Sequence, residues 1–411
     1  MKEEKQIESV FRTEYSKLIA VLCKTYGLSQ IEIAEDIVSA TFIQASETWK
    51  LKGIPKSPTG WLYTVAKNRT KDYLKRKTIF EQKINPVLQQ KSNNYRQESL
   101  DLSSENIEDG KLRMLFAIVH PSISKESQIA IALKILCGFS IDQITTALVS
   151  NKSAVNKLLF RAKQKLRKGR VKLDFPEGKA LETALDNVLS TLYLLFNEGY
   201  HSKTEDKQLN KEFCTEALYL STLLLKEPTI AKPKVYALIA LMCFHSSRFK
   251  SRFHNNTVFL YEEQNRTLWD NELIEKGEEY LNLSATGDAI SNYHLEAAIA
   301  YWHTQDDDKE KWENILQLYN YLLQLTYSPI AAMNRTYALS KARSVKEAIV
   351  EAKKINLNNS YLYHCLLAKF YETISISKAI LCLEKALKLK IPKTDKEIIS
   401  FRLIKLKSKC E

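Results

Sequence analysis

Glycine, proline and long apolar runs are scarce in this chain of 411 residues. It contains 10 glycines and 9 prolines, together roughly 40% of average usage. Since both residues interrupt helices, their scarcity favours an all-α fold. No apolar run approaches the roughly 20 residues that span a bilayer, and the charged N-terminal segment lacks the apolar centre of a signal peptide. We therefore expect a soluble, cytoplasmic protein that does not contact a membrane.

The seven cysteines show no pattern that would link them. Their number is odd, and no two of them have the spacing of a C-x-x-C motif. A disulfide framework and a zinc site both need such regular spacing. The sequence therefore predicts free, buried thiols in a reducing compartment, and it predicts neither a metal nor another cofactor.

Positive charge is concentrated in the first two-fifths of the chain. Residues 1–170 contain 29 Lys and Arg against 17 Asp and Glu, whereas residues 171–411 contain 32 against 31. Two basic clusters stand out, over residues 67–77 and residues 161–170, and the second has six basic side chains and no acidic one. Such clustering indicates a polyanionic partner, in particular nucleic acid.

The chain divides into four segments. Apolar residues recur at helical spacing over residues 5–77. Residues 78–110 are polar, weakly periodic and rich in Gln, Asn and Ser, so we expect a flexible linker there. The blocks that follow, residues 111–170 and residues 176–411, are again helical in pattern. Two helical domains joined by a linker, then a larger helical domain, are predicted.

The second domain has the layout of a helix-turn-helix. We expect helices over residues 125–137, 141–149 and 153–168, with Ser140 as the cap of the middle helix. A short turn and a last helix with an exposed polar face would place that helix in the major groove of DNA.

One spacing recurs in the C-terminal domain. The spacing consists of three apolar or aromatic residues, of which the second and third lie four and seven positions after the first. Its three copies begin at Ile315, Ala348 and Ala379. The offsets are close to the 34-residue period of tetratricopeptide repeats. Stacked helical pairs of that kind form a concave surface suited to a protein partner.

The motifs of residues 1–170 resemble those of sigma-70 family sigma factors, in particular the extracytoplasmic-function class. The string AEDIVSATFI, residues 34–43, is similar to the helix of sigma domain 2 that docks on the β′ subunit of RNA polymerase. The string GWLYTVAKNR, from residue 60, resembles the helix that faces the −10 promoter element, and residues 52–59 stand where the family captures an extruded base. Residues 113–168 resemble sigma domain 4, whose helix-turn-helix reads the −35 element.

The remainder of the chain resembles a subgroup of this class with a tetratricopeptide-like C-terminal extension. The matching strings occur in consistent order and are HPSIS from residue 120, YLLFNEGY from residue 193, EQNR from residue 263 and HLEAAIA from residue 294. One departure lies in the docking helix, where the family usually has Gln and an acidic residue and this chain has Ser39 and Ala40.

The resemblance implies roles for three groups of residues. The group implied for core-polymerase binding is Glu35, Asp36, Ile37, Thr41 and Phe42. The group implied for the −10 element is Lys52, Trp61, Asn68, Arg69, Lys71, Asp72, Lys75 and Arg76. The group implied for the −35 element is Lys152, Ser153, Asn156, Lys157 and Arg161.

The same resemblance implies the function and the partners. The protein would direct transcription initiation at a subset of promoters by binding core RNA polymerase, through its β′ and β subunits, and promoter DNA. The C-terminal domain would supply regulation, with a protein partner of its own. A sigma factor of this kind needs no catalysis.

Other interpretations of the same residues remain open. Trp61 and Phe42 suit packing as well as base contact, and a basic face can be merely solvated. An enzyme could use Glu198 with His201, or other histidines as metal ligands, although no known catalytic motif is present. A DNA-binding regulator could use the helix-turn-helix alone and sense a protein or peptide through the repeats. Promoter binding that depends on core polymerase would separate a sigma factor from such a regulator.

Overall fold

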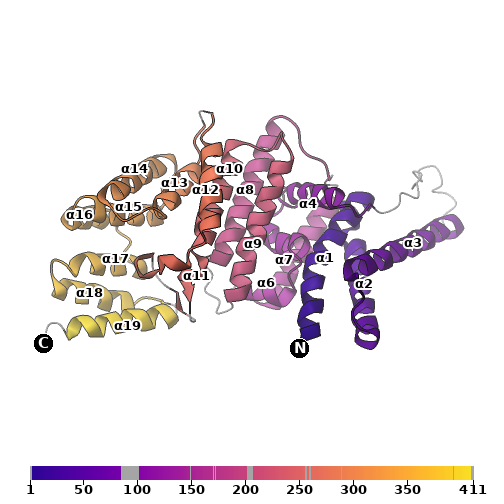
Figure 1. Cartoon of the computed structure of the whole chain (residues 1–411), viewed down its shortest axis with the longest axis horizontal. Helices are drawn as coiled ribbons and strands as arrows, with labels where there is room; N and C mark the ends of the chain where they lie inside the picture. Colours follow the sequence, from indigo (N-terminus) through magenta and orange to yellow (C-terminus); the bar gives the residue numbers. More distant parts are fainter. Residues whose placement is uncertain are drawn as a thin grey trace. The chain divides into compact units, whose positions relative to one another are not determined.

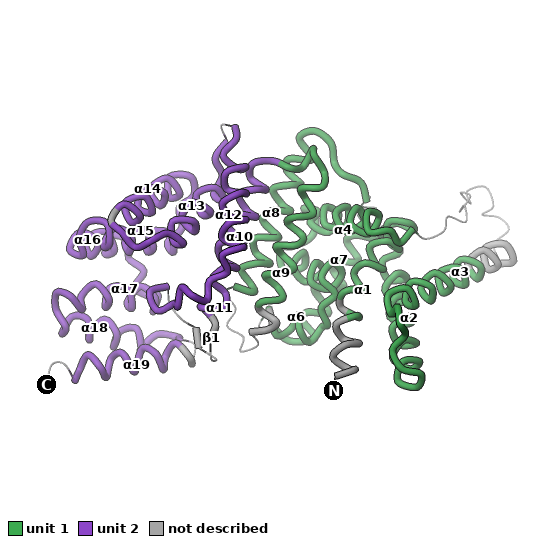
Figure 2. The backbone as a smooth tube through the Cα atoms, viewed as in Figure 1, with its two compact units in different colours: residues 1–231 green, residues 232–411 purple. Residues whose placement is uncertain are grey.

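The computed structural model describes residues 2–84, 101–148, 150–169, 171, 173–200, 207–254, 257–258, 261–287, 289–391 and 393–408. The chain forms two compact units, residues 1–231 and residues 232–411, called unit 1 and unit 2 below (Figure 2). Regular structure in the described residues is helical apart from one pair of two-residue strands (Figure 1). The prediction of an all-α fold is confirmed.

Unit 1 runs from helix α1 to helix α9. Its helices are α1 (Lys2–Tyr26), α2 (Ile31–Lys52), α3 (Pro58–Ile84), α4 (Ser104–Ile118), α5 (Lys125–Ile131), α6 (Ile141–Ala147), α7 (Lys152–Lys168), α8 (Lys179–Tyr200) and α9 (Lys207–Leu223). Helix α5 continues as a π-helical segment, Ala132–Leu136. Helices α8 and α9 are part of unit 1, so the boundary between the units falls after Ala231 and not near residue 176.

Helix α1 lies in the core of unit 1. Residues 18–23 of this helix are completely buried because α1 packs against α2 and α3 and also against α4 and the π-helical segment. Gly110 permits the close approach of α4 to α1, since a Cβ atom at this position would lie 3.2 Å from the carbonyl oxygen of Ala20. Two segments far apart in the sequence therefore share one apolar core.

The predicted linker over residues 78–110 is helical at both ends. Helix α3 continues to Ile84, and α4 begins at Ser104. The side chain of Ser103 caps α4 by accepting a hydrogen bond from the backbone N–H of Asn106 at 3.3 Å. This cap satisfies a donor that the first helical turn would otherwise leave without a partner, which favours helix formation in a polar segment. Residues 85–100 lie outside the described residues.

The helix-turn-helix segment is defined by two caps. Ser140 caps α6 in a capping box, which confirms the predicted cap. Its hydroxyl oxygen accepts a hydrogen bond from the backbone N–H of Gln143, and the Gln143 side chain accepts one from the backbone N–H of Ser140. Asn151 caps α7 by accepting a hydrogen bond from the backbone N–H of Ala154 at 2.8 Å. The last helix then packs its apolar residues, Val155, Leu159, Ala162 and Leu166, into the interior.

Unit 2 runs from helix α10 to helix α19. Its elements are α10 (Pro233–Ser247), α11 (Phe249–Arg252), β1 (Phe253–His254), β2 (Thr257–Val258), α12 (Asn271–Ser284), α13 (Asn292–Trp302), α14 (Lys309–Leu325), α15 (Pro329–Ala342), α16 (Val345–Ile355), α17 (Tyr361–Tyr371), α18 (Ile376–Leu387) and α19 (Lys393–Lys407). Helix α10 is apolar on nearly all sides and packs against α11, α12 and α13.

The repeated spacing marks inward-facing positions of alternate helices in unit 2. The three copies lie in α14, α16 and α18, and their first residues, Ile315, Ala348 and Ala379, are completely buried. Each of these helices packs against its sequence neighbours, and one apolar core extends through α13–α17. The spacing therefore marks the core, while the tetratricopeptide-like assignment itself remains a prediction.

Candidate nucleic-acid interface

Helix α3 presents a polar and basic face to solvent. Of the residues predicted to face the −10 element, five on this helix are exposed, namely Asn68, Lys71, Asp72, Lys75 and Arg76. Their spacing of three or four residues puts most of them along one side of the helix. Lys52, at the end of α2, is exposed as well. None of the four cations forms an ion pair with a residue that the structure describes, so they are available to phosphates.

Trp61 and Arg69 face α2 instead. Trp61 is half-buried, and its ring meets that of Trp49 edge-on with centroids 5.6 Å apart. The Arg69 guanidinium donates a hydrogen bond from Nη2 to Oε1 of Gln44 at 2.9 Å. Both side chains hold α3 against α2, so they position the basic face of α3 in the free protein.

The polymerase-docking residues predicted on α2 fall on two sides of the helix. Ile37, Thr41 and Phe42 are buried in the interior of unit 1, where Phe42 packs against Phe11 with ring centroids 4.5 Å apart. Glu35 is also buried, at 9% exposure, and of the predicted group only Asp36 is exposed. The apolar stripe of α2 therefore belongs to the core of unit 1.

The outer side of α2 is a line of exposed residues that sequence reasoning missed. It consists of Glu32, Asp36, Ser39, Ile43 and Glu47. Ile43 is a large apolar residue with 60% of its surface exposed. Helical spacing could have identified this side of α2, because residues 39 and 43 lie on the same side of the helix as the predicted residue Asp36.

All five residues predicted to read the −35 element are exposed on α7. Lys152, Ser153, Asn156, Lys157 and Arg161 lie on the side of the helix opposite its buried apolar residues. Lys152 also forms an ion pair with Asp142 of α6 at 2.6 Å. The structure thus brings these five side chains together on one surface.

Two further side chains lie on that surface and were missed. Phe160, with 60% of its surface exposed, and Gln164 line a shallow groove together with Ser153, Asn156, Lys157 and Arg161. Both occupy positions that continue the same helical spacing, and the aromatic residue was hidden in the sequence by the apolar residues that flank it. Since an aromatic ring can contact the methyl group of thymine in the major groove, Phe160 adds an apolar group to a basic reading surface.

A third side of α7 faces α2. Lys163 forms an ion pair with Glu35, and Arg167 forms one with Glu32 at 3.3 Å. The hydroxyl of Tyr15 donates a hydrogen bond to Glu35 at 3.4 Å. Burial and the neighbouring Glu35 carboxylate raise the pKa of the Tyr15 hydroxyl, so it remains a donor. The buried carboxylate of Glu35 therefore joins three helices.

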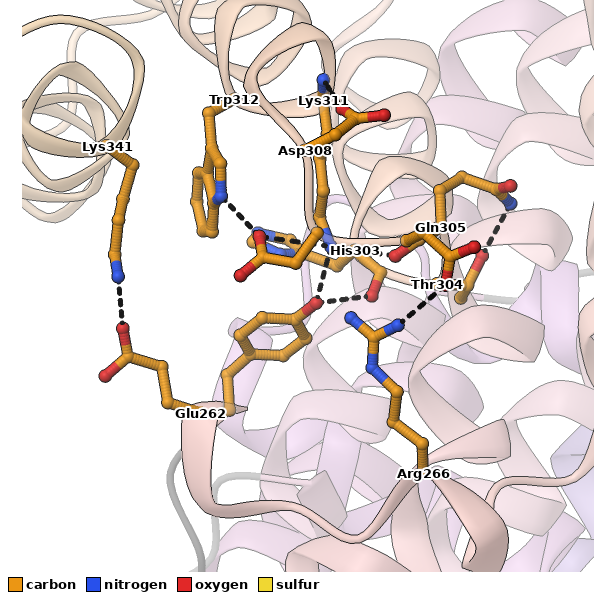
Figure 3. Close-up of polar contacts among 12 residues, drawn as sticks. Glu262, Arg266, His303, Thr304, Gln305, Asp308, Lys311, Trp312 and Lys341 are labelled. Carbon is orange, nitrogen blue, oxygen red and sulfur yellow. Dashed lines mark hydrogen bonds and ion pairs between the residues drawn. The ribbon is translucent and has the colours of Figure 1, made fainter.

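Unit 2 contains a cluster of polar contacts around residues 261–266 (Figure 3). Lys311 is completely buried and donates hydrogen bonds to the hydroxyl of Tyr261 at 2.8 Å and to the carbonyl oxygen of Gln305 at 2.9 Å. The Tyr261 hydroxyl in turn donates to the carbonyl oxygen of His303 at 2.8 Å. Burial lowers the pKa of His303 well below its usual value, so the imidazole is neutral. These contacts hold residues 261–266 against α13 and α14.

Glu262 ties the same segment to two further helices. Its carboxylate forms ion pairs with Lys341 of α15, at 2.8 Å, and with Lys369 of α17, and it accepts a hydrogen bond from the hydroxyl of Tyr337. Burial alone would raise the pKa of Glu262, but these three donors outweigh it and lower the pKa to about 2. The string EQNR from residue 263 marked this segment, but no local sequence pattern pointed to its partners on α13, α14, α15 and α17.

Neither a metal site nor a membrane span emerges from the described part of the chain. Its His, Cys, Asp and Glu side chains nowhere form a group of three or more that could hold a metal ion. Its helices include none that is long and apolar enough to cross a membrane. Glu198 lies in α8, where burial raises its pKa, while His201 lies outside the described residues.

Comparison with known proteins gives two family matches and one curated relative. Residues 11–79, which include all of α2 and most of α1 and α3, match the family described as Sigma-70 region 2. Residues 184–285 match the family described as Family of unknown function (DUF6596). An uncharacterized protein from Rhizobium meliloti is 30% identical over 342 residues, which cover 82% of this chain and 81% of the relative. No solved structure gives a significant match.

The helical fold, the basic face of α3 and the region 2 match together define a DNA-binding transcription factor. Residues 11–79 match a Sigma-70 region 2 domain, which supports a sigma factor of the sigma-70 family, and the chain belongs to the same family as the Rhizobium protein. A Sigma-70 region 2 domain supports binding of core RNA polymerase and promoter DNA in general. A domain of the DUF6596 family follows in the C-terminal half.

Proposed function

We propose that this protein is a sigma factor of the extracytoplasmic-function class that directs RNA polymerase to a subset of promoters by reading both the −35 and the −10 element. The observation that carries the proposal is the exposed surface of α7, where all five predicted readers lie together. Region 2 alone accounts for polymerase and −10 binding, so this surface adds the second DNA contact.

At the −35 element, α7 enters the major groove as the second helix of the helix-turn-helix. Lys152, Lys157 and Arg161 neutralise phosphates or bind guanine, while Ser153 and Asn156 reach base edges. The helix is fixed for this task because the apolar side opposite the readers is buried.

At the −10 element, the exposed cations of α3 follow the backbone of the separated strand. A basic groove beside aromatic side chains suits single-stranded DNA, whose bases stack on rings. The loop between α2 and α3 begins at Gly53, which has a φ of 79° that other residues rarely adopt. This backbone shapes the loop that we propose captures an extruded base.

Polymerase docking uses the outer side of α2. Asp36 and Ile43 are exposed on it, one charged and one apolar, and a partner helix with an apolar stripe and basic flanks would complement both. We propose the β′ subunit as this partner and the β subunit as a contact of domain 4. Ile43→Arg should weaken core binding at least tenfold, whereas Leu381→Arg in unit 2, at a site of similar exposure, should leave it unchanged.

The proposal is tested by run-off transcription with core polymerase and a library of upstream DNA. We expect transcripts from a small set of templates only when the protein is added, and these templates should share two sequence elements. The matched comparison is the variant Asn156→Ala/Arg161→Ala, which should abolish template selection while core binding persists. Polymerase-independent binding to DNA, with no transcript, would contradict the proposal and favour a regulator.

We also propose that unit 2 regulates the sigma factor through a protein partner. Residues 232–411 contain 26 Lys and Arg against 21 Asp and Glu, a smaller excess than that of residues 1–170, which suits a protein partner better than DNA. A truncation that tests this should follow Ala231, because α8 and α9 pack on domain 4, where Phe213 meets Phe139 at 4.5 Å between ring centroids. Transcription that is unchanged by removal of residues 232–411 would contradict a regulatory role.

A further inference from the structure

Helix α19 is apolar on two opposite sides. On its inner side, Ile399 and Leu406 are buried in a core that it shares with α18. On its outer side, Ile398, Phe401 and Ile404 are exposed, and Phe401 has 72% of its surface in contact with solvent. A helix that is apolar on all sides is typical of one that is covered all round. The outer side of α19 therefore lacks the cover that its residues predict.

Helix α19 lies at the edge of the helical stack of unit 2 (Figure 1). Helix α17 packs against α18, and α18 packs against α19, the last helix that the structure describes. In stacked-helix proteins each helix covers the apolar side of its neighbour, and the outer side of a terminal helix is polar where water covers it. The apolar outer side of α19 is thus suited to a further protein surface.

Polar contacts on its other sides fix the orientation of α19. Arg402 forms an ion pair with Glu372, at the end of α17, at 2.7 Å. Lys407 forms one with Glu384 of α18 at 2.8 Å. Because these contacts and the buried inner side hold the helix in place, it does not turn its outer side towards the core.

The outer side of α19 is arranged symmetrically about Phe401. Ile398 lies three residues before Phe401, and Ile404 lies three residues after it. Glu397 and Lys405 lie four residues before and after Phe401, on the same side of the helix, and both are exposed. Neither of these two side chains forms an ion pair within the part of the chain that the structure describes. The apolar centre is therefore flanked by a free carboxylate at one end and a free ammonium group at the other.

A second copy of α19 in antiparallel orientation complements this arrangement. A two-fold axis at Phe401 brings each residue before Phe401 level with the residue equally far after it in the other copy. Ile398 then lies level with Ile404 of the second copy, and Glu397 lies level with its Lys405, about 6 Å along the helix from the axis. In a parallel pair, by contrast, like charges would lie level with each other. Only the antiparallel pair matches both the apolar and the charged residues.

We infer that the outer side of α19, formed by Glu397, Ile398, Phe401, Ile404 and Lys405, is an interface between two copies of this chain related by a two-fold axis at Phe401. The inference does not rest on the proposed function, since all its residues belong to unit 2. One helix from each copy forms a small interface, so the two copies associate weakly and separate in dilute solution.

Sedimentation velocity of the full-length protein, over about a hundredfold range of concentration, tests this interface. We expect the fraction of dimer to rise with concentration. Phe401→Arg places two cations against each other at the axis and should raise the dissociation constant of the dimer by about tenfold or more. The matched control is Leu381→Arg on α18, at another exposed apolar residue of unit 2, and it should dimerise like the wild type.

Charge reversal tests the antiparallel orientation. Glu397→Lys and Lys405→Glu each place like charges level at both ends of the interface, and each should raise the dissociation constant about three- to tenfold at low salt. The double variant Glu397→Lys/Lys405→Glu restores both pairs and should dimerise like the wild type. An equimolar mixture of the two single variants should also associate, because the mixed dimer contains one Lys–Lys pair fewer at each end than the first variant alone.

The outcomes decide the inference. A monomer at every concentration would overturn it, and so would a dimer that Phe401→Arg leaves intact, because the copies would then meet elsewhere. A double variant that stays as weak as the single variants would show that Glu397 and Lys405 do not meet across the interface. Circular dichroism checks that each variant is folded. Should Phe401→Arg unfold, the charge variants, at exposed positions, still decide between these outcomes.

Discussion

The basic faces of α3 and α7 in unit 1 and the segment of residues 261–266 in unit 2 use charge in different ways. In unit 1, Lys71, Lys75 and Arg76 on α3 and Lys157 and Arg161 on α7 are exposed and form no ion pair with any residue that the structure describes. In unit 2, lysines and arginines join segments by ion pairs, of which those between Glu262 and α15 and α17 are examples. Cations without protein partners are available to a polyanion, whereas paired cations contribute to the fold.

This difference agrees with the uneven distribution of net charge along the chain. Residues 1–170 have an excess of basic residues, and residues 171–411 have nearly equal numbers of both signs. The exposed cations of α3 and α7 belong to this excess, whereas Lys341 and Lys369 in the balanced part pair with Glu262. Substitutions of the exposed cations on α3 and α7 should therefore change binding, and substitution of Glu262 should change stability.

The largest effect is expected from the basic face of α3. Lys71→Gln/Lys75→Gln/Arg76→Gln removes three phosphate contacts and should weaken promoter binding by the polymerase complex about 10- to 100-fold at moderate salt. The dependence of the binding constant on salt should become shallower by about 2 in its logarithmic slope. Filter binding at several salt concentrations measures both. The control Lys385→Gln/Lys388→Gln/Lys390→Gln in unit 2 changes charge equally and should bind like the wild type.

The next largest effect is expected for the stability of unit 2. Glu262 has a pKa of about 2 in the folded protein, below its ordinary 4.5. Its contribution is therefore complete above pH 4.5 and is lost as pH falls towards 2. Because 37% of the side chain is exposed, solvent screening reduces the effect, and Glu262→Gln should lower the unfolding free energy by about 1–2 kcal/mol at pH 7.

Denaturant unfolding between pH 7 and pH 4 checks this prediction. The difference between Glu262→Gln and the wild type should shrink below pH 4.5. Glu397→Gln, at an exposed position of α19, is the matched control and should show little change at any pH. A difference that grows towards low pH would contradict the assignment of the ion pairs.

A smaller effect is expected from Phe160. If its ring contacts a thymine methyl group, replacing that thymine with uracil should weaken binding to the −35 element about fourfold, from the roughly 0.8 kcal/mol of one buried methyl group. Phe160→Ala should remove the difference between thymine and uracil. Tyr321→Ala, at an equally exposed aromatic residue of unit 2, should preserve it. If Phe160→Ala keeps the difference in binding between thymine and uracil, the ring of Phe160 does not contact the DNA.

The smallest effect is expected for the exposed ion pair between Lys152 and Asp142. Both side chains are 67% exposed, and exposed pairs contribute little to stability. Asp142→Asn should therefore change the unfolding free energy by no more than about 0.5 kcal/mol, as measured by thermal unfolding. A loss several times larger would show that exposed pairs in unit 1 stabilise the fold, and it would weaken the contrast between the units.

Local pattern was sufficient for most of the helices. Helical spacing and the cap at Ser140 predicted α6 and α7 close to their observed ranges. The predicted linker was too long at both ends, because its polar composition hid the cap at Ser103 and the continuation of α3 to Ile84. The polar composition of a segment shows that it is exposed to solvent, but it does not show where a helix begins. The start of α4 depends on one hydrogen bond, from the backbone N–H of Asn106 to the side chain of Ser103.

The candidate site was predicted in part for a similar reason. The sequence marked α2 as the docking helix but did not distinguish its buried side, with Ile37 and Phe42, from its outer side, with Ile43. That distinction depends on what packs against the helix, which no local pattern contains. The ion pair of Glu35 with Lys163 and that of Glu262 with Lys369 join residues more than 100 positions apart, and only the fold brings them together.

The most direct test of the account is a footprint of the complex on a selected promoter, combined with detection of unpaired thymines. The account predicts protection of two segments about 25 base pairs apart and reactive thymines at the −10 element, only when core polymerase and this protein are both present. Protection of a single segment by the protein alone, with no strand opening, would contradict it.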